Sequence, residues 1–79
     1  MSTLDELNIG QKAQVARVRG GGELRRRLMD MGITQGVEIQ VLKVAPMGDP
    51  IEYKLRGYHL SLRKSEASLI EIKAVESAS

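Results

Sequence analysis

The sequence contains no cysteine, no tryptophan and no phenylalanine, and it has a single histidine. The absence of cysteine excludes a disulfide, a thiolate nucleophile and a cysteine-ligated zinc site. One histidine does not support a Ser–His–Asp arrangement. The three glycines at 20–22 stand between a strand pattern and a helix pattern, but no Lys-Ser or Lys-Thr pair follows them as in a P-loop. We interpret them as a flexible linker and predict that the protein is not an enzyme and has no cofactor.

Long hydrophobic runs are also missing. No stretch approaches the roughly 20 apolar residues that a membrane-spanning helix needs. The first ten residues include Asp5 and Glu6 and lack the apolar region of a signal peptide. We therefore expect a soluble, cytoplasmic protein with no direct membrane insertion, and the lack of cysteine fits a reducing compartment.

The length of 79 residues predicts one domain over residues 1–79, with an ordered core at about 3–75. A domain of this size buries only about 60% of the surface that its unfolded chain exposes. Its apolar residues are therefore needed for packing, which leaves few to line a cavity for a small-molecule substrate.

Strand-like patterns dominate the sequence. They occupy residues 13–19, 36–45, 51–55, 60–62 and 69–75. Val15 and Val18 cannot share a face in a regular strand, so we predict a bulge or a strong bend between them. The apolar positions shift phase after Val41 to Leu42 and Val44, which is typical of a strongly coiled strand. In the last strand, Ile70 and Ile72 are predicted to point inward.

Two helical segments interrupt this pattern, apart from a turn at 65–67. Residues 3–7 form a predicted N-terminal helical turn, and a helix is predicted from about Gly22 to Met31. Its apolar stripe comprises Leu24, Leu28 and Met31, and Gly32 suits the left-handed position after a helix. We predict the i, i+4 ion pairs Glu23–Arg27 and Arg26–Asp30 along it. The outline is a mainly β fold: a small, closed, five-stranded SH3-like barrel with a short α-helix inserted after the first strand.

Charge is unevenly distributed, although the chain has a net charge of only +2. From Lys12 to Arg27 there are six basic residues and one acid, Glu23. Such a patch can bind nucleic acid, an anionic membrane surface or an acidic protein. The two aromatics, Tyr53 and Tyr58, are too few for polyproline recognition or for base stacking. Nonspecific duplex binding through phosphates stays open.

Two methionines stand out as candidate contact residues. On a helical wheel Met29 lies beside Arg25, off the apolar stripe, and Met47 lies at a predicted loop tip. We predict a partner-binding surface that comprises Arg25, Arg26, Met29 and Met47. His59 alternates with Leu60 and is predicted to face solvent. No spacing connects it to Met47, Asp49 or Glu52, so we predict no metal site.

Several segments together resemble the FeoA family of ferrous iron transport proteins. They are Leu28-x-x-Met31-Gly32-Ile33-x-x-Gly36, Val37 to Pro46, Gly48-Asp49-Pro50 and Gly57 to Arg63. The resemblance covers residues 3–75. Single pieces also resemble the C-terminal SH3-like domain of metal-dependent DtxR-type repressors, but no helix-turn-helix domain precedes the barrel in this sequence.

The resemblance implies an accessory protein that works with FeoB, a membrane Fe(II) transporter with a cytoplasmic G-protein domain. The main hypothesis is therefore a non-enzymatic regulator of ferrous iron uptake that acts by protein–protein interaction. Two alternatives stay open: a nucleic-acid-binding barrel, which the scarcity of aromatics disfavours, and a weak Fe(II) metallochaperone.

Overall fold

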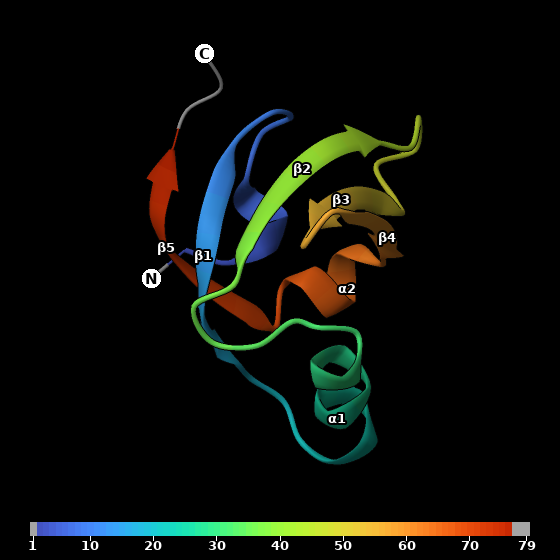
Figure 1. Ribbon diagram of the computed structural model, residues 1–79. Coiled ribbons are helices and arrows are strands. Elements are labelled where there is room, and N and C mark those ends of the chain that lie inside the picture. The colour runs from blue at the N-terminus through green and yellow to red at the C-terminus, as the bar shows by residue number, and fades with distance from the viewer. Residues whose placement is uncertain (1, 77–79) are drawn as a thin grey trace.

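The computed structural model describes residues 2–76, which form one curved antiparallel sheet with an excursion at one end (Figure 1). In chain order the elements are η1 (Leu4–Glu6), β1 (Lys12–Val18), α1 (Gly22–Asp30), β2 (Glu38–Val44), β3 (Ile51–Leu55), β4 (Tyr58–Leu62), α2 (Lys64–Ala67) and β5 (Ile70–Glu76). The predicted order of strands and helices is confirmed. Within the described residues, no helix has the length and apolar character needed to span a membrane.

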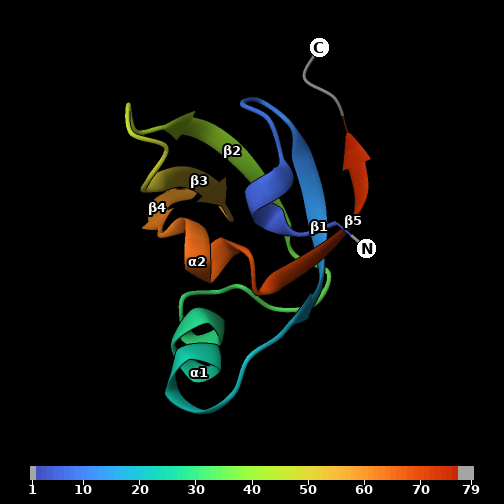
Figure 2. The same ribbon diagram turned by 180° about the vertical axis from the view of Figure 1, so that it is seen from behind.

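The strand order is β4-β3-β2-β1-β5, so β4 and β5 are the two ends of the sheet. The predicted closure is therefore not made by hydrogen bonds between these two strands in the described part of the chain. The 3-10 turn η1 packs against β5 and α2 (Figure 2). Its Leu4 is fully buried, and the Ile72 amide donates to the Ser2 carbonyl at 3.0 Å. Helical elements thus cover part of the core at the place where the two end strands of a closed sheet would pair.

The core is built from the inward faces of all five strands and single residues of the helices. Its largest fully buried side chains are Tyr53, Leu4, Leu28, Ile33, Ile39, Leu55, Leu62, Ile70, Val15 and Val41. Ile70 and Ile72 point inward as predicted. The Tyr53 hydroxyl is buried and has no hydrogen-bond partner within residues 2–76. The other nine side chains of this set are apolar.

Irregularities in the strands explain why the sequence alternation is imperfect. The pairing of β1 with β5 shifts register between Val15 and Arg17, and both Val15 and Val18 are buried, so the predicted bulge is confirmed. The pairing of β2 with β3 shifts between Val41 and Lys43. Val44, however, remains 38% exposed, because the strand runs past the edge of the core at this point. The prediction that the buried face of this strand changes to Leu42 and Val44 is therefore only partly met.

Two residues other than glycine adopt positive φ. Arg56, with φ of 51°, precedes Gly57 in the two-residue turn that joins β3 and β4. Ala74, with φ of 53°, lies in β5 where its register with β1 shifts. A left-handed conformation costs an alanine about 1 kcal/mol or more relative to its usual backbone.

The inserted helix α1 lies outside the sheet, between β1 and β2 in sequence (Figure 1). Leu28 is its one fully buried residue, and Leu24 and Met31 pack partly against the core. The helix ends as predicted: Gly32 has φ of +97°, its amide donates to the Met29 carbonyl at 3.0 Å, and the Ile33 amide donates to the Leu28 carbonyl at 3.1 Å. This pair of bonds is a Schellman motif, which aims the following chain back into the core.

Candidate partner-binding site

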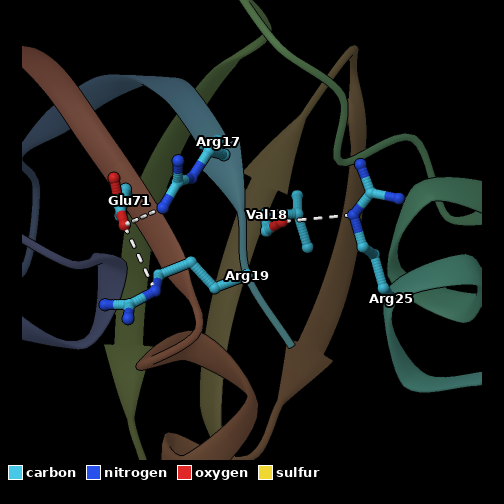
Figure 3. A network of polar contacts seen from close by, with 5 residues as sticks. All are labelled: Arg17, Val18, Arg19, Arg25 and Glu71. Carbon is cyan, nitrogen blue, oxygen red and sulfur yellow. Dashed lines mark hydrogen bonds and ion pairs between the residues drawn. The ribbon is translucent and has the colours of Figure 1, made fainter. Parts of the chain in front are cut away.

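The basic segment of the sequence does not form one continuous cationic surface. Arg17 and Arg19, on and just after β1, both reach the carboxylate of Glu71 on β5, at 3.5 and 3.3 Å (Figure 3). The Glu71 side chain is only 12% exposed, so its charge is stabilised by the two guanidinium groups. These two arginines therefore hold β1 to β5, and half of the charge they carry is already compensated.

Arg27 has a structural partner as well. Its guanidinium pairs with the carboxylate of Glu66 on α2. The other carboxylate oxygen of Glu66 accepts from the Arg63 amide at 2.8 Å and so caps α2. The predicted pair Glu23–Arg27 is therefore wrong, because a largely buried carboxylate from another element competes better for Arg27 than an exposed one on the same helix.

Arg25 and Arg26 are the two arginines of α1 whose charge is not compensated. The Arg25 Nε donates to the carbonyl of Val18, at the end of β1, over 3.2 Å (Figure 3). Arg26 takes part in none of the ion pairs found within residues 2–76, so the predicted pair Arg26–Asp30 is not formed. Both side chains remain accessible to a partner, since both residues are exposed.

These two arginines and Met29 line one open depression, which the residues 20–22 and Asp30 complete. Met29 is 39% exposed, so part of its apolar side chain is available to a partner. The structure thus brings three of the four predicted contact residues together. We call Arg25, Arg26 and Met29 the α1 face.

Met47 is separate from the α1 face. It belongs to the connection between β2 and β3. In both views this connection lies at the end of the molecule opposite α1 (Figures 1 and 2). Its side chain is 93% exposed, so the predicted loop-tip position is confirmed. Because the sheet lies between them, Met47 and the α1 face cannot form a single compact patch.

The residues weighed for metal binding serve other contacts. His59 is exposed as predicted, and its Nδ1 lies 3.4 Å from Glu52, which also pairs with Lys43 at 3.7 Å. Asp49 accepts from the Lys64 amide at 2.8 Å. Over residues 2–76, no three His, Cys, Asp or Glu side chains gather in a way that could hold a metal ion.

Sequence reasoning missed the two carboxylates that organise this surface, Glu66 and Glu71. Glu71 stands between two inward-facing isoleucines of β5, and Arg17 and Arg19 are spaced two apart. An acid inside an apolar strand, together with an Arg-x-Arg pair, signals a buried ion pair. Glu66 carried a weaker signal, since it stands three residues after Arg63 at a helix start, where a carboxylate can cap.

Comparison with known proteins gives the family. A family model described as the FeoA domain matches residues 2–74. The chain is 39% identical over 74 residues to an Fe(2+) transport protein A/Fe(2+) transporter FeoB fusion protein of Porphyromonas gingivalis. That match covers 94% of this chain but only 9% of the relative, so the chain spans less than a tenth of the relative's length.

Solved structures agree with this assignment. The FeoA-like protein of Clostridium acetobutylicum superimposes with a TM-score of 0.84 at 49% identity, over 90% of this chain and 83% of the other. The FeoA of Stenotrophomonas maltophilia, solved with zinc and described as a prokaryotic SH3 domain protein, gives a TM-score of 0.87 at 27% identity over 100% of both chains. The SH3-like fold and the predicted resemblance are thereby confirmed, and the chain belongs to the FeoA domain family.

Proposed function

We propose that this protein is a non-enzymatic accessory protein of ferrous iron uptake, which acts by binding a FeoB-type Fe(II) transporter on the cytoplasmic side of the membrane. One observation carries the proposal: in the Porphyromonas gingivalis relative, a domain 39% identical to this chain shares one polypeptide with a FeoB transporter. Fusion raises the effective concentration of two partners, so it is favoured for domains that act together.

The α1 face supports a role in contact better than a role in catalysis. The depression beside it is open and shallow, and its side chains offer charge and an apolar methionine rather than a convergent acid–base set. Exposed arginine and methionine are enriched at protein–protein interfaces. We propose that the α1 face contacts the soluble G-protein domain of the transporter, and that Met47 makes a second, separate contact.

The test is copurification of the tagged chain with the full-length FeoB-type transporter encoded in the same genome, in detergent. The double charge reversal Arg25→Glu with Arg26→Glu is expected to reduce the recovered transporter at least about tenfold, because like charges across an interface are strongly unfavourable. The fold should persist, since both residues are exposed and neither belongs to the core.

A matched control places the same charge change elsewhere. Lys12 and Lys54 are exposed strand residues that take part in none of the ion pairs within residues 2–76. Lys12→Glu with Lys54→Glu is expected to copurify as the wild type does. If both double variants lose the transporter equally, net charge rather than the α1 face governs binding. If the wild type itself fails to copurify, the proposed function is wrong.

A second candidate function, weak metal carriage, rests on one observation: the Stenotrophomonas maltophilia relative was solved with zinc. In this chain the nearest arrangement to a site is His59 beside Glu52, at 3.4 Å. Two ligands on an exposed strand face give a weak site at most. Calorimetry with Zn(II), comparing wild type with His59→Ala, decides: a micromolar isotherm that the substitution abolishes would establish this function.

A further inference from the structure

We infer that the partner segment bound by the α1 face carries a carboxylate that pairs end-on with the guanidinium of Arg25, next to an apolar side chain that covers Met29. This inference rests on the proposed function, and it names the chemistry of the partner. It separates an acidic protein segment from the other polyanions that a basic patch can attract, which are nucleic acid and anionic lipid.

Arg25 is already held in place before any partner arrives. Its Nε donates to the Val18 carbonyl at 3.2 Å, and within the described residues this is the one hydrogen bond that its side chain makes (Figure 3). The edge formed by the two terminal nitrogens is therefore left for a bidentate carboxylate. A side chain fixed in this way loses less conformational entropy on binding than a free arginine does.

The distribution of charge favours a protein segment over a polyphosphate or a membrane. Nucleic acid and anionic membranes are bound by stripes of uncompensated cations. Here Arg17 and Arg19 share Glu71, and Arg27 pairs with Glu66. The acids Glu23 and Asp30 also lie on α1, among the arginines. An array of phosphates would come close to these acids and be repelled by them. A folded partner can instead place a single carboxylate beside one arginine.

The apolar part of the contact comes from Met29. It is 39% exposed and lines the same depression as Arg25 and the residues 20–22, whose glycines carry no side chains to block an approach. Methionine adapts its shape to an apolar neighbour at little cost. A carboxylate flanked by an aliphatic or aromatic side chain therefore fits this surface better than an isolated charge.

The discriminating variant is Arg25→Lys, because lysine keeps the charge but cannot bond to Val18 and present a two-nitrogen edge at once. Binding to the detergent-purified transporter, measured by biolayer interferometry, is expected to weaken about tenfold. Arg26→Lys, which has no such anchor, is expected to weaken it by no more than about threefold. Arg63→Lys makes the same substitution at the start of α2, at a residue that does not line the depression of the α1 face, and is expected to leave binding unchanged.

A measurement on the wild type removes any dependence on the folding of variants. Phenylglyoxal modifies accessible arginines, and mass spectrometry locates the products. In the complex, Arg25 is expected to be protected, and Arg56, in the β3–β4 turn, is expected to react as in the free chain. Equal reactivity of Arg25 in the two states overturns the inference, and so does a loss for Arg26→Lys that equals or exceeds the loss for Arg25→Lys.

Failure of the inference and failure of the proposed function give different results. If the wild type binds the transporter but Arg25→Lys binds equally well, the carboxylate pairing is wrong and the proposed function stands. If the wild type does not bind the transporter, the proposed function fails first. Binding to vesicles with 30% phosphatidylserine or to duplex DNA at physiological salt, with no binding to the transporter, assigns the α1 face to another polyanion and overturns both.

Discussion

In the sheet, Arg17 and Arg19 share the carboxylate of Glu71, whereas on α1 two of the three arginines form no ion pair within residues 2–76. Glu71 compensates half of the charge of Arg17 and Arg19, which lie two residues apart at the end of β1, and it does so from a largely buried position. On α1 one residue, Leu28, is fully buried, and Arg25 and Arg26 are exposed. Within the described residues, α1 is thus attached to the core through one fully buried side chain and carries uncompensated charge on its surface.

The strongest test of this contrast is Leu28→Ala. Leu28 is fully buried, so its truncation is expected to cost about 2–4 kcal/mol in the free energy of unfolding. Leu24→Ala, on the same helix but only partly buried, is expected to cost about 1 kcal/mol. Urea unfolding measures both. A loss below about 1 kcal/mol for Leu28→Ala would show that α1 is not anchored through this residue.

The Tyr53 hydroxyl predicts a dependence of sheet stability on pH. Burial, with a smaller contribution from the Asp5 carboxylate, raises the pKa of Tyr53. Above about pH 10 the folded chain therefore keeps a proton that the unfolded chain releases, so stability falls as pH rises, by about 1.4 kcal/mol per pH unit.

Tyr53→Phe removes this titration. At pH 7 the change is expected to be within about 0.5 kcal/mol of neutral, because the hydroxyl has no hydrogen-bond partner within residues 2–76. At pH 11 the variant is expected to be more stable than the wild type by about 1 kcal/mol. If the free energies of unfolding of Tyr53→Phe and wild type differ by the same amount at pH 7 and at pH 11, the prediction is wrong.

Glu66→Gln tests how α1 is held to the sheet. Glutamine can still accept from the Arg63 amide through its oxygen, but it cannot form an ion pair with Arg27. Amide exchange in α1 is expected to accelerate, while global stability falls by no more than about 1 kcal/mol, since the Arg27 side chain is 63% exposed. Glu23→Gln, the same change on the free face of α1, is the control. Unchanged α1 exchange in Glu66→Gln would show that the ion pair does not hold the helix.

The smallest expected effect is a gain in the sheet. Ala74 has φ of 53°, a conformation that glycine adopts without strain, so Ala74→Gly is expected to stabilise the chain by about 0.5–1 kcal/mol. Ala16→Gly, in β1 and not among the residues with positive φ, is expected to destabilise by a similar amount. A midpoint of thermal unfolding that falls for both variants contradicts the interpretation of the β5 bulge.

The fold was predictable where the cause is local. The helix end at Gly32 follows from a glycine after an apolar stripe, and the bulge in β1 follows from Val15 and Val18 being three apart. The gathering of Arg25 and Met29 was predictable for the same reason, since both belong to one helix. The fold class followed from the five short strand patterns, and the family resemblance agreed with it.

Long-range pairings were not predictable from one sequence. Arg27 and Glu66 are 39 residues apart, and Arg17 and Glu71 are 54 apart. Their pairing depends on how α2 and β5 return to the first half of the chain. The distance of Met47 from the α1 face has the same origin, because it is set by the direction of the β2–β3 connection (Figure 1).

The way the chain leaves and re-enters the sheet around α1 has a broader consequence. Residues 19–37 leave the sheet after β1 and return to its immediate neighbour β2. Two hydrogen bonds hold the returning chain beside β1: the Gly36 amide donates to the Val15 carbonyl at 2.7 Å, and the Val15 amide donates to the Val37 carbonyl at 2.9 Å. A segment whose two ends are joined beside each other can change in length or composition at little thermodynamic cost to the rest. We therefore expect the exposed positions of the excursion to be exchangeable between relatives at little cost, provided that the fully buried Leu28 and Ile33 are kept.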